Sequence, residues 1–158
     1  MKVVRLRLPE LGLELDQLHA GPAMVTCIPD MANTTWPAQE IFAALTSESL
    51  AEAARYSPDE TVDPRAGTIM LSFNCYVIQT PHYVALIDGG IGDGKERPHR
   101  PAWHRRESGF LATLAAIGVS SEDIDIVVNT HLHADHVGWN TRWDGDGWRP
   151  TFPKARYV

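Results

Sequence analysis

The sequence has little cysteine, no long apolar run and few basic residues, and each shortage excludes a class of protein. Its two cysteines, Cys27 and Cys75, form no CxxC pair, so we expect no disulfide framework and a reducing, cytoplasmic setting. No segment approaches the ~20 apolar residues that span a bilayer, and the charged N-terminus does not resemble a signal peptide, so we expect no membrane partner. The net charge of −6 argues against nucleic-acid binding, which needs an excess of Lys and Arg.

The residues that are present indicate a globular protein: 44% of them are hydrophobic and 22% are charged. The length of 158 residues suits one domain, residues 1–158. Hydrophobic periodicity predicts strands at 4–8, 24–28, 68–79, 83–87 and 124–129, helices at 37–56 and 107–117, and a loop at 57–67. The strands at 68–79 and 83–87 read as a β-hairpin, and the order hairpin, helix, buried strand, loop is typical of an α/β layered fold.

A dense cluster of potential metal ligands follows the last of these strands. Residues 131–136 read His-Leu-His-Ala-Asp-His, and three imidazoles and a carboxylate within six residues make a zinc-type ligand set. His131 and His133 are two residues apart and point to the same side of an extended chain, whereas Asp135 and His136 are adjacent and diverge. One loop can therefore offer two ligands to one ion and two to a second. Zinc is expected, and manganese, iron or cobalt would also suit such ligands.

Two segments resemble the metallo-β-lactamase superfamily. Asn-Thr-His-Leu-His-Ala-Asp-His-Val-Gly (129–138) resembles its HxHxDH signature, and Leu-Ile-Asp-Gly-Gly (86–90) resembles its upstream strand end. The resemblance covers about residues 68–158 and implies the N-terminal part of an αββα sandwich. It also implies that His131 and His133 bind a first ion, that Asp135 and His136 bind a second, and that Asp88 supports the site from behind. We expect Thr130 to share this supporting role.

The resemblance implies a hydrolase of small molecules. In such an enzyme a metal-bound hydroxide attacks an ester- or lactone-type bond, and Asp135 serves as the catalytic residue by orienting the attacking water. Residues 130–141 look most like those of lactonases and general metallo-hydrolases of the family.

The sequence departs from the family downstream of the motif. The family uses a further His, a bridging Asp and a last His there, but residues 137–158 contain no His. Asp144 and Asp146 belong to Asp-Gly-Asp-Gly (144–147), which is typical of a hairpin turn. We therefore expect an incomplete domain without its C-terminal half. Such a chain would have weakened or lost activity, and would be homo-oligomeric or dependent on a complementing chain.

Two alternatives remain open beside the hydrolase. The chain could be a non-catalytic metal-binding fragment, or one half of a split enzyme that a partner chain completes. It could also be an oxidoreductase of the same superfamily with a flavin or a di-iron site, although the extra carboxylates of iron-binding members are not seen.

Three further features have competing interpretations. The basic segment 95–106 could attract an anionic substrate, and we favour the simpler interpretation of a solvated loop. Trp139 could line a substrate pocket or pack in the core. The glycines between 89 and 94 suggest a phosphate loop only superficially, because no Lys-Ser/Thr follows them.

Overall fold

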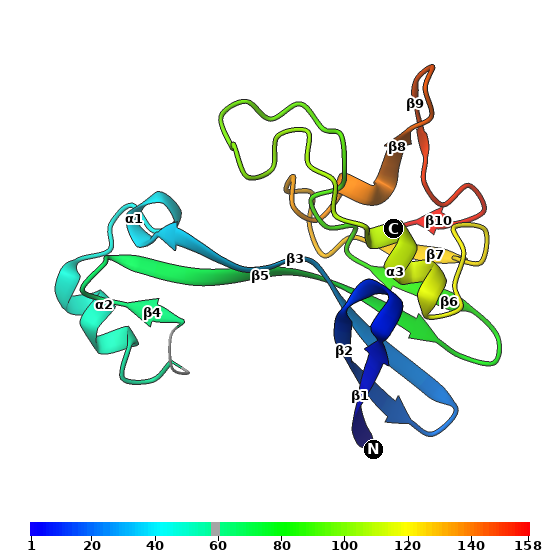
Figure 1. Cartoon of the computed structure of the whole chain (residues 1–158), viewed down its shortest axis with the longest axis horizontal. Helices are drawn as coiled ribbons and strands as arrows, with labels where there is room; N and C mark the ends of the chain where they lie inside the picture. Colours follow the sequence, from blue (N-terminus) through cyan, green and yellow to red (C-terminus); the bar gives the residue numbers. More distant parts are fainter. Residues whose placement is uncertain (58–60) are drawn as a thin grey trace. The chain divides into compact units, whose positions relative to one another are not determined.

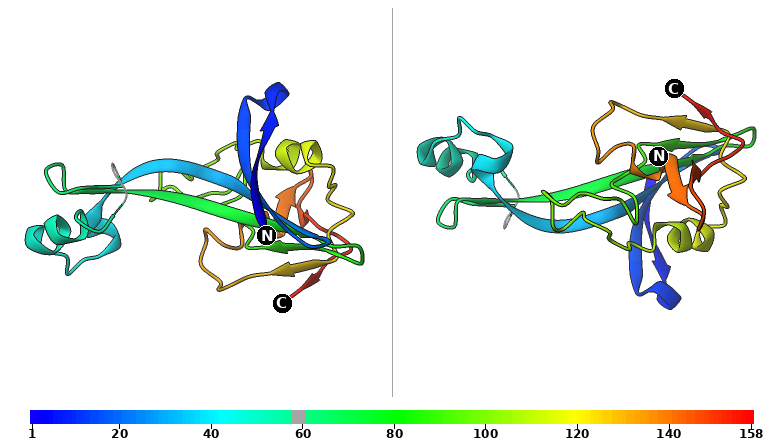
Figure 2. Two further views of the ribbon diagram at one scale, coloured as in Figure 1. Left: turned by 90° about the horizontal axis from the view of Figure 1, so that it is seen from below. Right: turned by 90° about the horizontal axis from the view of Figure 1, so that it is seen from above.

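The computed structural model describes residues 1–57 and 61–158, so residues 58–60 of the expected loop at 57–67 lie outside the described part. The chain forms two compact units, which we call the sheet unit (residues 1–30 and 73–158) and the inserted unit (residues 31–72). Figures 1 and 2 show the chain from three sides. Within the described ranges, no helix combines the length and the apolar character needed to cross a membrane.

One mixed sheet organises the fold, with the strand order β1-β2-β3-β5-β6-β7-β10 and β4 beside β5. Its strands are β1 (Lys2–Leu8), β2 (Leu13–Ala20), β3 (Ala23–Pro37), β4 (Val62–Asp63), β5 (Thr68–Gln79), β6 (Val84–Ile87), β7 (Ile126–Val128) and β10 (Arg156–Tyr157). The pairs β1–β2, β2–β3 and β5–β6 are antiparallel, whereas β7 lies parallel to both β6 and β10. This mixed sheet confirms the α/β class.

The expected β-hairpin is confirmed, since β5 and β6 pair from Gln79↔Val84 to Tyr76↔Ile87. The expected strand at 24–28 is the beginning of the longer β3. Strand β2 was not expected, although Leu13-Glu-Leu-Asp alternates apolar and charged residues as a half-buried strand does.

The core of the sheet unit lies between the sheet and one helix, α3 (Phe110–Ala116), which confirms the helix expected at 107–117. Figure 1 shows α3 beside β6 and β7. Phe110 and Leu114 of α3 are buried together with Leu86 and Val127 of the sheet. Each such side chain contributes about 1.5–3 kcal/mol by leaving water. The parallel neighbours β6 and β7 are thereby held side by side, which places their carboxyl ends together.

A second hairpin follows the metal-ligand motif. The short 3₁₀ helix η2 (Gly138–Asn140) leads into β8 (Thr141–Trp143), which pairs with β9 (Trp148–Pro150); an earlier 3₁₀ helix, η1, spans Pro9–Leu11. The Asp144 carboxylate accepts hydrogen bonds from the backbone N–H groups of Asp146 and Gly147 at 3.0 and 2.9 Å. The expected turn at 144–147 is thus confirmed, and Asp144 serves it as a turn residue.

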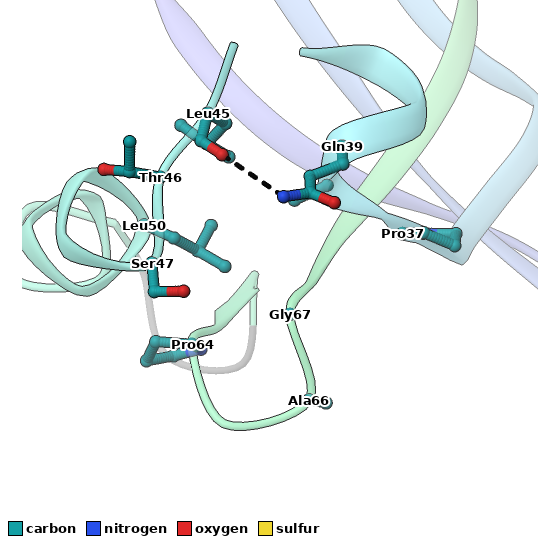
Figure 3. A pocket seen from close by; sticks show the side chains of 10 residues that line it. Pro37, Gln39, Leu45, Thr46, Ser47, Leu50, Pro64, Ala66 and Gly67 are labelled. Atoms are coloured by element: carbon teal, nitrogen blue, oxygen red, sulfur yellow. Dashed lines mark hydrogen bonds between the residues drawn. The ribbon is translucent and has the colours of Figure 1, made fainter. Parts of the chain in front are cut away.

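The helix expected at 37–56 is wrong, because the inserted unit has two shorter helices there, α1 (Ala38–Ile41) and α2 (Ser47–Ala53). Thr46 has an extended backbone and its hydroxyl accepts the Ser49 N–H at 3.1 Å, which starts α2 afresh. A hollow of about 280 Å³ is lined by residues of both helices and by residues 64, 66 and 67. Gln39 donates to the Leu45 carbonyl at 3.5 Å beside it (Figure 3). The apolar face of residues 41–45 stops at the polar run Thr-Ser-Glu-Ser (46–49), and the single helix expected here overlooked this start signal.

Candidate metal site

The motif loop begins where two parallel strands end. Strand β6 ends at Ile87 and β7 at Val128, and the Asp88 N–H extends their ladder by bonding to the Val128 carbonyl at 2.8 Å. Because the carboxyl ends of parallel strands meet at one sheet edge, Asp88 and Thr130 come together. The Asp88 carboxylate accepts the Thr130 N–H at 2.8 Å and its hydroxyl at 2.9 Å. The residues expected to support the motif are therefore in direct contact.

The glycine-rich loop after Asp88 runs against the end of the motif. Gly89 N–H bonds to the His136 carbonyl at 2.6 Å, and Gly138 N–H to the Gly90 carbonyl at 2.8 Å. A Cβ at Gly138 would lie 1.9 Å from the Ile91 carbonyl oxygen, so only glycine allows this approach. The glycines therefore allow two backbone segments to pack closely, and this role accounts for them without a phosphate-binding loop.

The three imidazoles of the motif lie together. The His131 ring centroid lies 3.9 Å from that of His136 and 4.6 Å from that of His133. His131 Nε2 faces His133 Nδ1 at 3.0 Å, and the other nitrogen of His131 contacts the Thr130 hydroxyl at 3.1 Å. The first expected ligand pair thus has two ring nitrogens side by side.

The second expected pair is oriented by Asp88. His136 Nδ1 lies 2.8 Å from the Asp88 carboxylate, and His136 Nε2 lies 3.3 Å from the Asp135 carboxylate. Burial raises the pKa of Asp88, but hydrogen bonds from Thr130 and His136 outweigh burial, so the pKa of Asp88 lies below its ordinary value. Asp88 is therefore an anion that fixes one nitrogen of His136 and leaves the other facing Asp135.

The donor set fits divalent cations as two pairs. Two ligand atoms that bind one tetrahedral zinc at 2.0–2.1 Å lie about 3.3–3.4 Å apart. The His131–His133 separation is 3.0 Å and the Asp135–His136 separation is 3.3 Å, close to that value. Within residues 1–57 and 61–158, no group of three or more His, Cys, Asp or Glu side chains is placed to hold one ion. Each pair would therefore leave further coordination positions to water, substrate or another ligand.

A buried carboxylate, Asp30, lies behind the glycine loop, beyond the end of the strand expected at 24–28, and was not among the expected site residues. Its side chain is fully buried. It accepts the N–H groups of Ile91 and Gly92 at 2.8 and 3.3 Å, Arg106 Nη1 at 2.7 Å and Trp139 Nε1 at 2.9 Å. Asp30 therefore ties the glycine loop, the basic segment and the residue after the motif together. No motif signalled it, because the donors are remote in sequence.

The basic segment is not simply a solvated loop, because three of its cations are held by the protein. Arg106 pairs with Asp30, and Lys95 Nζ donates to the carbonyl and hydroxyl oxygens of Thr141 at 2.8 and 2.7 Å. Arg97 donates to the carbonyls of Ile91 and Ala134 at 2.9 and 2.8 Å. The expectation failed because charge patterning cannot show which cations find buried acceptors.

Trp139 packs in the core, as one of its two interpretations proposed. It is buried, its ring stacks on that of Phe110 with centroids 5.1 Å apart, and its Nε1–H donates to Asp30. It also borders a hollow of about 390 Å³ whose other walls include Asp93, Arg142 and Trp143.

Residues 71–154 match the family model described as "Metallo-beta-lactamase superfamily". This range includes Asp88 and the whole histidine motif. No curated protein sequence matches the chain.

Solved structures with the same fold include metallo-hydrolases. The chain resembles AidC, described as a dizinc quorum-quenching lactonase, with a TM-score of 0.67 and 18% identity over 90% of this chain and 43% of that one. It resembles a probable metal-dependent hydrolase from Staphylococcus aureus with a TM-score of 0.65 and 26% identity over 89% and 47%. It resembles the hydrolase AbOPH with a TM-score of 0.60 and 23% identity over 89% and 42%. The chain spans less than half of the length of each. These matches confirm that it has the fold of part of such proteins.

Proposed function

The chain belongs to the metallo-β-lactamase superfamily, and on that premise we propose that it is a metal-dependent hydrolase acting on an ester- or lactone-type bond of a small molecule. The observation that carries the proposal is the arrangement of the motif as two facing donor pairs, one of which is oriented by the Asp88 anion. An exposed loop suits this chemistry, since Leu132 at its tip is 80% exposed and a substrate can reach the pairs from solvent.

We assign the first ion to His131 and His133 and the second to Asp135 and His136. When bound, a divalent ion acts as a Lewis acid that polarises a carbonyl and makes water a better nucleophile at neutral pH. Asp135 would orient the attacking water through its carboxylate. Asp88 holds the tautomer and ring orientation of His136, which is how outer hydrogen bonds keep a ligand aimed.

Support for the reaction class comes from two sources. The S. aureus protein, at 26% identity, is described as a probable metal-dependent hydrolase. The lactone class rests on the likeness of residues 130–141 to lactonases, while the structural match to AidC at 18% identity concerns the fold. We propose zinc as the metal, with manganese, iron or cobalt as alternatives, since similar ligand sets suit all four. We also propose a cytoplasmic location, with which the two free thiols agree.

The second candidate is a metal-binding chain that needs a complementing chain or a second copy for turnover. The specific observation in its favour is that the described donors reach only two per ion, whereas three protein ligands are usual at a catalytic zinc. A partner would then supply the remaining ligands.

The test is metal content and mass in solution of the purified full chain, followed by hydrolysis of an N-acyl homoserine lactone and an aryl ester. We expect bound zinc in the wild type and turnover that a chelator abolishes. Asp135→Asn should lose turnover, whereas His82→Gln, at an exposed position in the β5–β6 turn, should retain it. Metal binding without turnover would favour the complemented form, and absence of binding of zinc, manganese, iron and cobalt alike would overturn the proposal.

A further inference from the structure

The basic segment sends one side chain to the ligand loop. The Arg97 guanidinium donates from Nη1 to the Ile91 carbonyl at 2.9 Å and from Nη2 to the Ala134 carbonyl at 2.8 Å. Its own backbone N–H donates to His104 Nδ1 at 2.9 Å, and its cation lies 5.6 Å from the centroid of the Trp103 ring. The planar guanidinium thus joins the glycine loop to the middle of the histidine motif.

The hydrogen-bond acceptor on the motif side is the Ala134 carbonyl, which belongs to the peptide bond that precedes Asp135. The Ala134 carbonyl and the Asp135 N–H belong to one rigid plane, so a hydrogen bond to this carbonyl sets the plane from which the Asp135 side chain departs. The electrostatic environment agrees with this placement. Burial lowers the pKa of Arg97, and the nearby carboxylates of Asp135 and Asp30 oppose that effect.

The two donor pairs differ in what holds them. His131 and His133 contact each other, and His131 also contacts the Thr130 hydroxyl and packs against the His136 ring. His136 is held by Asp88, whereas Asp135 follows the peptide that Arg97 holds. A change at Arg97 should therefore act directly on Asp135 of the second pair, whereas His131 and His133 keep their contacts with each other and with Thr130.

We propose that Arg97 is a positioning residue that holds the Asp135–His136 pair in register and thereby determines occupancy of the second ion. The inference rests on the proposed function, because it assumes that these pairs bind metal. Arg97 acts through geometry: its fork spans two carbonyls of separate loops, which the single ammonium of lysine cannot reproduce in the same plane.

The experiment titrates the metal-free full chain with Co²⁺, following the visible absorption of each bound ion, and counts zinc by elemental analysis. The variants are Arg97→Gln and Arg97→Lys. The matched control is Arg105→Gln, in the same segment, whose side chain bonds to Glu96. We expect both Arg97 variants to bind the first ion as the wild type does and the second about 10–100-fold more weakly, as for other groups that orient a metal ligand. Arg105→Gln should match the wild type.

Thermal unfolding of the metal-free variants separates positioning from general support of the fold. Equal weakening of both ions together with a lower Tm would show a merely structural role and overturn the inference. Unchanged affinity for the second ion in Arg97→Gln, or full rescue by Arg97→Lys, would also overturn it. A wild type that binds a single ion would overturn this inference and leave the proposed function standing. A wild type that binds no ion would overturn the proposed function itself.

Discussion

Two carboxylates, Asp30 and Asp88, organise neighbouring parts of the sheet unit in different ways. The Asp30 side chain is fully buried and receives a guanidinium, an indole N–H and two backbone N–H groups. The Asp88 side chain is 11% exposed and receives Thr130 and one nitrogen of His136. The donors of Asp30 all belong to the scaffold, whereas one donor of Asp88 is a proposed metal ligand.

This difference indicates that the two carboxylates have different roles, one in holding the fold and one in orienting a proposed metal ligand. A buried carboxylate surrounded by donors is stable only while all its partners remain, so Asp30 locks the glycine loop in place. Asp88 instead fixes a side chain of the candidate site. It holds one nitrogen of the His136 ring, and the other nitrogen remains directed at Asp135. Asp30 should therefore control the stability of the fold, and Asp88 the affinity for metal.

The largest expected effect is that of Asp30→Asn. It removes the charge that balances Arg106, whose side chain is 13% exposed, and breaking a buried ion pair costs about 3–5 kcal/mol. This loss of stability is measured as the change in the free energy of unfolding in urea. The matched control is Asp16→Asn, which breaks the exposed pair with Arg5 and should cost less than about 1 kcal/mol. Similar losses in the two variants would contradict the assignment of Asp30.

Asp88→Asn should instead weaken metal binding by about 10–100-fold, because His136 loses the anion that orients it. Competition with a chromophoric zinc chelator measures this affinity. Asp123→Asn is the control, since Asp123 is an exposed carboxylate that bonds to Ser120. If Asp88→Asn bound zinc as tightly as the control, the distinction between the two carboxylates would not hold.

Trp139→Phe tests a single one of the hydrogen bonds to Asp30, the one from the indole N–H. It keeps a ring that can stack on Phe110 and removes the N–H donated to Asp30, so we expect a loss of about 1–3 kcal/mol in the free energy of unfolding. Zinc affinity should stay the same. Trp143→Phe, at an exposed position in β8, serves as the control in the same urea titration. A loss of zinc affinity without a loss of stability would argue against this role of Trp139.

The smallest effect concerns Lys95, a cation for which the described residues show no carboxylate partner, in contrast to Arg106. Burial and the charge of Arg97 lower the pKa of Lys95 to about 8, from an ordinary value of 10.5. Between these pH values the unfolded chain binds more protons than the folded chain, so the free energy of unfolding rises with pH across the window. Below pH 8 both states are protonated, and the unfavourable contribution of Lys95 is constant.

Lys95→Met should therefore remove the part of the rise in unfolding free energy that Lys95 causes between pH 8 and 10.5. Urea midpoints measured below and above this pH window will show the difference. Lys154→Met is the control, because Lys154 forms an exposed pair with Glu122 and should leave the pH dependence unchanged. An identical slope in Lys95→Met and the wild type would show that Lys95 is not responsible.

Periodicity predicted much of the fold because it reports which residues are buried. Strand β5 begins and ends where the sequence indicated, and its hairpin partner β6 begins one residue later than expected, at Val84. The helix expected at 37–56 was wrong because the polar residues 46–49 start a new helix, with the Thr46 hydroxyl as its cap. Local hydrogen bonds of this kind leave only a weak signal in hydrophobic spacing.

The candidate site was predictable where its residues are adjacent in sequence. The HxHxDH motif and the Asp88 strand end could be read directly, and the structure brings Asp88, Thr130 and His136 into contact. Whether these residues bind metal stays a prediction. The contacts of Asp30 with Trp139 and of Arg97 with Ala134 could not be read, because they join residues 109 and 37 positions apart.

The sequence by itself determined the family, the α/β class and the proposed ligands, since these depend on residue types at short spacing. Only the tertiary structure decided which charges are buried and which carbonyls they hold. The physical reason is that a hydrogen bond depends on the distance between two groups in space, and the parallel meeting of β6 and β7 creates distances that spacing along the chain does not contain.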